Sequence, residues 1–504
     1  MIEHRSIFLI AIVASLVISA WCVYADHVVN YDGVLYLLVA EDIMRGDWGN
    51  AVSLYKWPFY PALIALVSGP TDWNAEYAAY VVNAMLATLI VVAFMALVLE
   101  LGGDRRTLIA AALVILFYPE INQYRSFIIR DFGYLAFYLI SLLLFIRHYR
   151  CPSKLLAVSW FVSMLVATLF RVEGVIFLLY FPLLQYLNRR VSRGRWSVAI
   201  TGATALFVPL GLSFLWWTYS PTQKYDHLTG LTDPLAMMGG AWSQISTELS
   251  HKLYVVQEEF LVSISDDYAY VIFGLTLLLI VGWAIVSALG PLYGFLVGYG
   301  IYRRLVFPRR EIKRIWYAVI GAHVAILCVF TLSKLFLTGR YPLALTITML
   351  LAAPFSMTWI YTSRGGTCAT SLTRKWGFPA LVVLMTVTGI EGLDVFTTKN
   401  YVREAGLWLK ARVSNRASLY TNNAVLTYYA GRNPISDGIS EDWNVTVQTI
   451  ENGRWKDYDY LAISVRREYR EEGQRLQEIL KLQPIHTFVG EKGNRIIVFD
   501  TRQG

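Results

Sequence analysis

The chain reads Asn30-Tyr-Asp32-Gly33-Val-Leu-Tyr36-Leu-Leu-Val-Ala-Glu41 between two strongly apolar runs, residues 6–24 and 77–100. Each run has about the 20 residues that a helix needs to cross a bilayer. The residues from Val34 to Met44 form an amphipathic stretch, which predicts a helix lying along the membrane surface. Gly33 would permit a tight turn directly after Asp32. This pattern indicates a membrane protein whose first loop carries functional side chains.

The composition agrees with a membrane protein. Of the 504 residues, 56% are hydrophobic and 16% are charged, whereas soluble domains carry about 25% charged residues. The net charge of +8 comes from short cationic clusters between apolar runs, which are typical of cytoplasmic loops and argue against a nucleic-acid partner. The four cysteines include no Cys-X-X-Cys pair, which excludes a thiolate metal site and a disulfide framework.

The spacing of the cationic clusters predicts eleven transmembrane helices with the N-terminus in the cytoplasm. The expected spans are residues 6–24, 77–100, 107–123, 131–146, 155–170, 174–187, 198–217, one beginning near 270, 315–333, 343–361 and 378–394. The first run lacks a clean cleavage site, so we interpret it as an uncleaved span. The stretch 270–302 contains Gly290-Pro291 and is too long for one perpendicular crossing, which leaves one or two helical segments open.

These spans predict two domains. Residues 1–394 would form a transmembrane module with large external loops at about 25–76 and 218–269. Residues 395–504 have the composition of a soluble domain and are expected to form a small extracytoplasmic α/β domain. Its predicted helices cover 401–413 and 466–480, and its predicted strands cover 417–421, 458–465 and 495–500. Gly493-Asn494 is a plausible hairpin turn.

Charged side chains recur at the predicted outer turns, although ionisable groups beside membrane spans are costly. In chain order they are Asp32, Lys56, Glu120, Arg125, Arg130, Asp131, Arg171, Glu173, Lys334 and Arg340. A single pair of these is more simply explained as a structural salt bridge or a helix cap. Their recurrence at four successive turns favours a site that mixes a few carboxylates with several cations.

The first loop resembles that of the GT-C superfamily of glycosyltransferases that use polyprenyl-phosphate sugars. The nearest branch, glycosyltransferase family 39-like, holds the protein O-mannosyltransferases and the lipid A aminoarabinose transferases. In that branch an Asp after the first span begins an interfacial helix, a Gly-Asp-Trp-like end follows, and a Lys-Pro-Pro-like motif leads into the second span. Asp32 falls on the catalytic position, Gly46-Asp47-Trp48 on the helix end, and Lys56 on the motif lysine. Trp57 stands where the first proline would be.

Later segments resemble the same family in the same order. They are Arg125-Ser-Phe-Ile-Ile-Arg130-Asp131, Arg171-Val-Glu173-Gly174, Gly339-Arg340-Tyr341-Pro342, and the C-terminal stretches Gly406-Leu-Trp-Leu-Lys410 and Tyr428-Tyr429-Ala-Gly431-Arg432. The resemblance implies an α-helical, polytopic, GT-C-like fold with Asp32 and Asp131 as catalytic residues. It also implies that the donor phosphate or sugar is bound by Lys56, Arg125, Arg130, Arg171, Glu173, Arg340 and Tyr341.

The residue types support this chemistry independently. Transfer from a polyprenyl-phosphate sugar breaks an anomeric C–O bond, and the departing phosphate needs cations more than a general acid. The incoming hydroxyl needs one carboxylate base, whereas hydrolytic glycosidases require two carboxylates at a defined separation. With these groups present, the resemblance implies an inverting transferase in the plasma membrane, acting on the extracytoplasmic face. Its expected partners are a polyprenyl-phosphate sugar, a lipid, glycan or protein acceptor, and membrane lipids; no cofactor is expected, and a divalent metal stays open.

Two other functions stay open at this point. A transporter or flippase of lipid-linked sugars would place its binding charges near the midplane on broken helices, whereas the charges here lie at the outer ends of the spans. An O-antigen ligase or polymerase would keep its essential residues in the loop at about 218–269. Asp32 could also be a plain helix N-cap, and His323, midway along a span, is more simply a packing residue.

Overall fold

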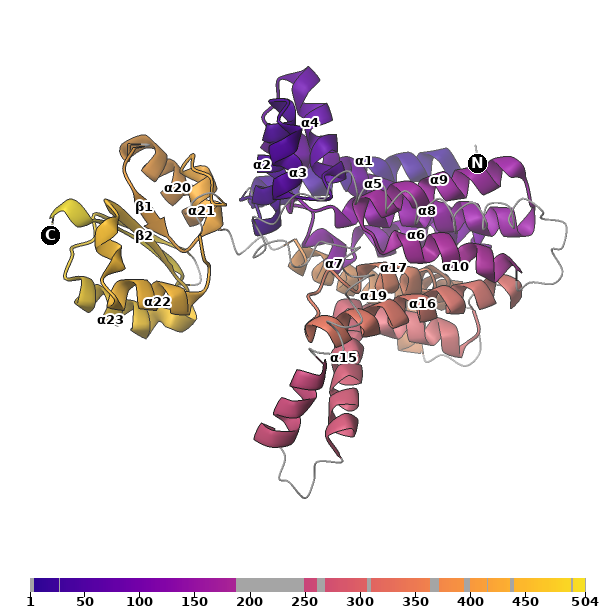
Figure 1. Cartoon of the computed structure of the whole chain (residues 1–504). Helices are drawn as coiled ribbons and strands as arrows, with labels where there is room; N and C mark the ends of the chain where they lie inside the picture. The colour runs from indigo at the N-terminus through magenta and orange to yellow at the C-terminus, as the bar shows by residue number, and fades with distance from the viewer. Residues whose placement is uncertain are drawn as a thin grey trace.

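The protein is described by a computed structural model for residues 4–26, 28–186, 249–260, 268–305, 310–362, 371–393, 399–414, 416–435, 439–490 and 493–503. Figure 1 shows a body of helices running side by side and a separate C-terminal unit at one end. In the described ranges, six helical segments are long and apolar enough to span a membrane: α1 (Arg5–Ala25), α5 (Ala75–Glu100), α8 (Asp131–Arg150), α15 (Ala269–Tyr302), α16 (Arg310–Lys334), and α17 (Leu343–Leu350) followed by α18 (Ala353–Thr362). The chain is therefore a multi-span, mostly helical membrane protein.

Four further helices of the body are α6 (Arg105–Leu116), α9 (Lys154–Phe170), α10 (Gly174–Tyr186) and α19 (Ser371–Glu391). Ten of the eleven predicted spans coincide with helices of the structure, while the expected span 198–217 and most of the loop 218–269 lie outside the described residues. Helix α6 ends at Leu116 instead of near residue 123, because Pro119 favours an extended conformation at Tyr118 (ψ 113°). The eleven-span topology as a whole stays a prediction.

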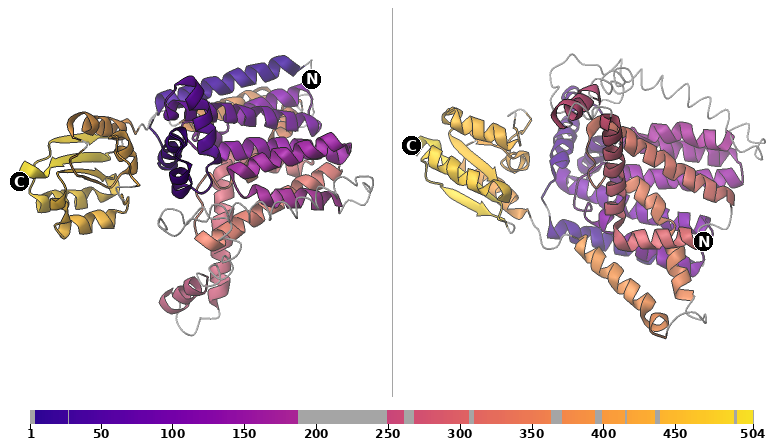
Figure 2. Two further views of the ribbon diagram at one scale, coloured as in Figure 1. Left: turned by 45° about the horizontal axis from the view of Figure 1, so that its top comes forward. Right: turned by 90° about the horizontal axis from the view of Figure 1, so that it is seen from below.

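Helix α15 is broken at Gly290, which has φ 65° and ψ 166° and is followed by Pro291. This conformation is open to glycine, and proline cannot continue the hydrogen-bonding pattern of the preceding turn. The second half packs into the bundle through buried Leu292 and Leu296. The first half projects away from the bundle (Figures 1 and 2) and exposes apolar side chains such as Trp283. The stretch that the sequence left open is thus two helical segments.

The first loop is folded into three helices at the end of the body nearest the C-terminal unit (Figure 1). These are α2 (Tyr31–Met44), α3 (Trp48–Leu54) and α4 (Phe59–Thr71). Helix α2 begins three residues before the predicted amphipathic stretch, packs against α4 and α5, and buries residues such as Leu37 and Ala40. The ring of Tyr36 packs edge-on against Tyr55 and Tyr60. The loop is therefore a packed cap and not a flexible connection.

The C-terminal unit contains a four-stranded mixed sheet in the order β1-β2-β4-β3. Its strands are β1 (Leu419–Thr421), β2 (Tyr460–Val465), β3 (His486–Val489) and β4 (Arg495–Asp500), and only the pair β1–β2 is parallel within the described sheet. Helices α20 (Asn400–Arg412), α21 (Ala424–Tyr429), α22 (Trp443–Glu451) and α23 (Arg470–Leu480) pack around it. The three predicted strands and two predicted helices are confirmed within a few residues, and Gly493 (φ 81°) lies in the β3–β4 connection as expected. Strand β3 was not predicted, since its four residues carry no strong pattern.

Candidate functional site

Asp32 lies in the first turn of α2, at the end of the body nearest the C-terminal unit. Its carboxylate forms an ion pair with the guanidinium of Arg340, which stands just before α17 and 308 residues later in the chain. Both side chains keep part of their surface accessible, 33% for Asp32 and 27% for Arg340. A substrate can therefore reach both members of this pair.

Asn30 holds the turn that presents Asp32. Its Oδ1 accepts a hydrogen bond from the backbone N–H of Ile128 at 2.7 Å, and its Nδ2 donates to the Ile128 carbonyl at 3.3 Å. Gly33 packs at the same contact, where a Cβ would lie 2.8 Å from Asn30 Oδ1 and 3.0 Å from Ile128 Cβ. The expected tight turn after Asp32 is wrong, because Gly33 is helical. Its missing side chain instead allows α2 to approach the 123–130 segment closely.

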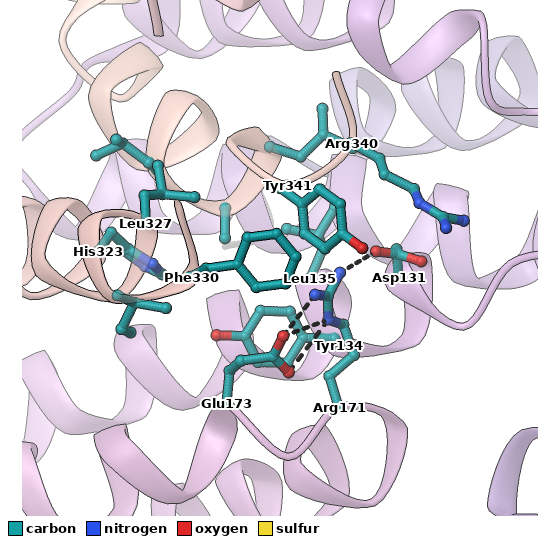
Figure 3. A pocket seen from close by; sticks show the side chains of 14 residues that line it. Asp131, Tyr134, Leu135, Arg171, Glu173, His323, Leu327, Phe330, Arg340 and Tyr341 are labelled. Atoms are coloured by element: carbon teal, nitrogen blue, oxygen red, sulfur yellow. Dashed lines mark hydrogen bonds and ion pairs between the residues drawn. The ribbon is translucent and has the colours of Figure 1, made fainter. Parts of the chain in front are cut away.

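A second cluster of charges lies beside this pair and consists of Asp131, Arg171 and Glu173 (Figure 3). Asp131 begins α8, while Arg171 and Glu173 form the turn between α9 and α10. One terminal nitrogen of Arg171 donates to Asp131, the other donates to Glu173 Oε1 at 2.5 Å, and Nε donates to both Glu173 oxygens at 3.2 Å. The side chains of Arg171 and Asp131 are only 12% and 7% exposed. We call these three residues the Arg171 triad.

The charges of the Arg171 triad stabilise one another. Burial alone would raise the pKa of Glu173, but the adjacent Arg171 guanidinium and its hydrogen bonds lower that pKa to about 2. Burial opposes charge on Arg171 as well, yet Glu173 and Asp131 raise its pKa well above the ordinary value. The triad is thus a compact network in which the donors of Arg171 are already engaged by two carboxylates.

Tyr341 connects the two clusters. Its ring lies 5.4 Å from the Arg171 guanidinium carbon and 5.9 Å from that of Arg340, distances at which a cation and an aromatic face attract. A cavity of about 60 Å³ lies alongside, lined by Asp131, Tyr134, Leu135, Arg171, Glu173, His323, Ile326, Leu327, Phe330, Arg340, Tyr341, Leu343, Ala344 and Leu345. It offers polar groups at one end and apolar side chains at the other (Figure 3), which suits a small polar group with an apolar neighbour.

Arg130 approaches the same region from the α8 side. One of its terminal nitrogens donates to the Tyr55 hydroxyl at 2.5 Å, and its guanidinium carbon lies 5.8 Å from the Tyr55 ring. Lys56 follows Tyr55 directly and is exposed, and the next residue, Trp57, donates from its indole nitrogen to the Leu169 carbonyl at 2.6 Å. These contacts place Arg130 and the Lys56 segment at the same end of the bundle as Asp32.

Arg125 faces a different part of the molecule. Its guanidinium donates to Asn122 Oδ1 at 2.9 Å, to Ser19 Oγ at 2.7 Å and to Ser15 Oγ at 3.1 Å, and the residue is 1% exposed. These partners lie on α1 and on the short helix α7 (Pro119–Asn122), so they favour a structural role for Arg125. The structure thus brings Asp32, Asp131, Arg171, Glu173, Arg340 and Tyr341 together, with Arg130 and the Lys56 segment at the same end of the bundle, and turns Arg125 away from them.

Of the aromatic residues of the site, sequence reasoning named Tyr341 but missed Tyr134 and Tyr55. Tyr134 lies under Arg171, with 6.0 Å between its ring centroid and the guanidinium carbon, and Tyr55 is the hydrogen-bond partner of Arg130. A signal was present in the sequence, because Tyr134 follows Asp131 by three residues and shares its helix face. The prediction for His323 holds in part: its ring packs against Tyr138 and Phe177, and it also lines the cavity.

No protein-family model and no curated protein matches this chain by sequence. Solved structures match it by fold. ArnT from Cupriavidus metallidurans in the apo state matches with a TM-score of 0.53 at 12% identity, over 99% of this chain and 98% of that chain. This chain has the fold of ArnT. The predicted GT-C resemblance is thereby confirmed at the level of the fold.

Two further structures support the same fold. ArnT bound to undecaprenyl phosphate matches with a TM-score of 0.54 at 13% identity, over 98% of this chain and 97% of that chain. The Archaeoglobus fulgidus oligosaccharyltransferase, tethered to an acceptor peptide with an NVT sequon, matches with a TM-score of 0.51 at 14% identity. That match covers 97% of this chain and 74% of the oligosaccharyltransferase. Because the two matches to ArnT cover 99% and 98% of this chain, they include the C-terminal unit as well as the helical body.

Proposed function

We propose that this protein is an integral-membrane glycosyltransferase that moves a sugar from a polyprenyl-phosphate donor to an acceptor hydroxyl on the extracytoplasmic face. The observation that carries the proposal is the accessible Asp32–Arg340 ion pair beside the Arg171 triad, at one end of a helical bundle with the fold of ArnT. A carboxylate and a cation are the two groups that this reaction needs, and here they lie in direct contact.

In this proposal the donor phosphate is bound by Arg340, Arg130 and Lys56. Among the described carboxylates, Arg340 forms its ion pair with Asp32, with Asp131 also near enough to stabilise its charge, and it remains accessible. Arg130 has a neutral phenol as its hydrogen-bond partner. Arg171 is less suited to bind the phosphate, because its hydrogen-bond donors are already engaged by two carboxylates. It would orient the sugar end of the site together with Glu173 and Tyr341. An arginine can bind phosphate with two parallel hydrogen bonds, which favours Arg340 as the main contact.

Asp32 is the proposed base. The donor phosphate competes for Arg340 and thereby releases the Asp32 carboxylate, which accepts the proton of the acceptor hydroxyl as its oxygen bonds to the anomeric carbon. The bond between that carbon and the phosphate oxygen breaks, and polyprenyl phosphate departs with the electron pair. Because this is a single displacement, the anomeric configuration inverts. Asp131 is second in rank as a base, since Arg171 holds it in the triad.

The proposal includes the topology predicted from the sequence. Residues 1–394 form the catalytic module in the plasma membrane, with eleven spans and a cytoplasmic N-terminus, and residues 395–504 form an extracytoplasmic domain. The position of the C-terminal unit at the Asp32 end of the bundle supports this arrangement (Figure 1). A reporter fused after Gly504 should read extracytoplasmic, and a cytoplasmic signal would overturn the orientation.

The activity is tested with purified protein, a panel of polyprenyl-phosphate sugars and lipid, glycan and peptide acceptors. We expect one donor to release polyprenyl phosphate in step with glycosylation of one acceptor. Comparison of envelope glycans between the wild type and a deletion strain identifies the natural sugar. Movement of an intact lipid-linked sugar between leaflets without bond cleavage would overturn the proposal in favour of a flippase. Unchanged envelope glycans under expressing conditions would count equally against it.

A further inference from the structure

The hydroxyl of Tyr429 lies between the C-terminal unit and the turn that carries Asp32. Tyr429 ends α21 and is 6% exposed. Its hydroxyl accepts a hydrogen bond from the backbone N–H of Val29 at 3.1 Å and donates one to Glu76 Oε1 at 3.1 Å. Val29 stands three residues before Asp32, and Glu76 lies in the first turn of α5. One phenol thus joins three segments that are far apart in the sequence.

The surroundings of Tyr429 hold this hydroxyl in place. The guanidinium carbon of Arg403, on α20, lies 5.6 Å from the Tyr429 ring. Helix α20 can approach α21 because Gly406 has no side chain; a Cβ there would lie 2.5 Å from Tyr429 Cβ and 2.8 Å from the Leu426 carbonyl. Burial and the nearby Glu76 carboxylate both raise the pKa of Tyr429. The phenol therefore keeps its proton and remains a donor to Glu76 across the physiological pH range.

The Asp32 turn is consequently held by hydrogen bonds on two sides. Asn30 binds the backbone of Ile128 on the membrane-body side, and Val29 binds Tyr429 on the side of the C-terminal unit. Figure 1 shows α20 and α21 on the face of that unit turned toward α2. Val29 and Asn30 directly precede α2, so these contacts fix the position of the chain where the helix that carries Asp32 begins.

We propose that Tyr429 is a positioning residue through which the C-terminal domain fixes the direction of Asp32 toward Arg340 and the substrate. The inference rests on the proposed function, in that positioning matters for a base that must meet an acceptor hydroxyl. It gives the C-terminal domain a role in catalysis that requires no contact with substrate. A misplacement of about 1 Å at a reacting group can reduce a rate by up to 10²-fold.

The test compares Tyr429→Phe with the matched control Tyr428→Phe, which removes a hydroxyl from the neighbouring ring, outside the Val29–Tyr429–Glu76 chain of hydrogen bonds. For Tyr429→Phe we expect kcat to fall about 10- to 100-fold with the donor KM unchanged, because the cations that bind phosphate are untouched. Tyr428→Phe should keep both values. Glu76→Ala removes the group that orients the hydroxyl from the other side and should reproduce the loss in kcat.

A second measurement is independent of catalysis. Hydrogen–deuterium exchange should show faster exchange of the Val29 amide in Tyr429→Phe than in Tyr428→Phe, at an equal melting temperature. Any of three results would overturn the positioning role. They are unchanged exchange of the Val29 amide, faster exchange without a loss of kcat, and a rise in KM at constant kcat. If the wild type transfers no sugar, the proposed function fails, and the exchange experiment still decides whether Tyr429 holds the turn.

Discussion

The Asp32–Arg340 pair and the Arg171 triad are built from the same kinds of side chain at the same end of the bundle, yet they differ in access and in partners. Asp32 is 33% exposed and meets one cation, whereas Asp131 is 7% exposed and belongs to a network in which one arginine meets two carboxylates. A charged group with one accessible partner can exchange it for substrate. A charged group in a closed network cannot do so without loss of stability. The pair is therefore suited to chemistry, and the triad to holding the sugar end of the site in a fixed geometry.

The largest expected effect is that of Asp32→Asn. This change keeps the shape of the side chain and removes its basicity, and general-base contributions are typically about 10²–10⁴-fold in rate. We expect turnover to fall by that amount while donor binding and the melting temperature persist. Turnover with purified donor and acceptor checks this. Wild-type turnover by folded Asp32→Asn protein would remove the contrast between the two clusters and make Asp131 the next residue to test.

The triad should respond in stability. Arg171→Ala leaves Asp131 and Glu173 without their cation, and the loss of one partner of a buried ion pair costs roughly 3–5 kcal/mol. We expect the lower part of that range, because Glu173 remains 27% exposed. Thermal unfolding in detergent measures the effect, with exposed Arg475→Ala as the control. An unchanged melting temperature combined with weaker donor binding would assign Arg171 to the phosphate instead.

Arg340→Ala should show the opposite balance. A charge-assisted hydrogen bond contributes about 1.5–3 kcal/mol, so loss of the phosphate contact should weaken donor binding about 10- to 100-fold. Stability should change little, since the partner Asp32 keeps contact with water. Equilibrium binding of a polyprenyl-phosphate sugar measures the loss of donor affinity in Arg340→Ala, with Arg340→Lys measured beside it. Equal affinity for the donor in Arg340→Ala and the wild type would contradict the proposed phosphate site.

The smallest effect concerns Glu120 in the short helix α7. Its pKa is raised, whereas that of Glu173 is lowered. Burial raises the pKa of Glu120 to about 7, although Gln123 donates a hydrogen bond to its carboxylate at 2.6 Å. The folded protein thus retains a proton that the unfolded chain loses near pH 4.5, so this group makes stability fall as the pH rises from about 4.5 to 7. Glu120→Gln should flatten that part of the melting-temperature profile. An identical profile in the variant would place the titration on another group.

Much of the fold could be predicted from the sequence because the patterns that specify it are local. Apolar runs predicted the helices of the body within a few residues, and alternation predicted three strands of the C-terminal sheet. The exceptions are also local in origin: Pro119 shortened α6, and Gly290 broke α15. The ordered motifs predicted the GT-C-like fold, which the match to ArnT bears out over nearly the whole chain.

The candidate site was predictable only as a set of residue types near one end of the spans. The sequence lists Arg125, Arg130, Arg171 and Arg340 as equal candidates, since each follows or precedes an apolar run. Their side chains differ only in the folded protein, where Arg125 turns toward Ser15 and Ser19 while Arg340 reaches Asp32. The sequence likewise contains no sign that Tyr429 lies beside Val29.

By itself, the sequence determined the helical membrane body and three strands of the C-terminal sheet, because hydrophobic periodicity and turn residues act over a few neighbours. It singled out Asp32 only through the resemblance of the first loop to a known family, and the role of that carboxylate stays a prediction. The tertiary structure decided which cation meets which carboxylate, which charges stay accessible and which hydroxyl fastens the Asp32 turn. These properties depend on distances between segments separated by tens to hundreds of residues. Hydrogen bonds form only at about 3 Å between donor and acceptor, and Coulomb energies weaken as the distance grows, so both are set only when packing has fixed those distances.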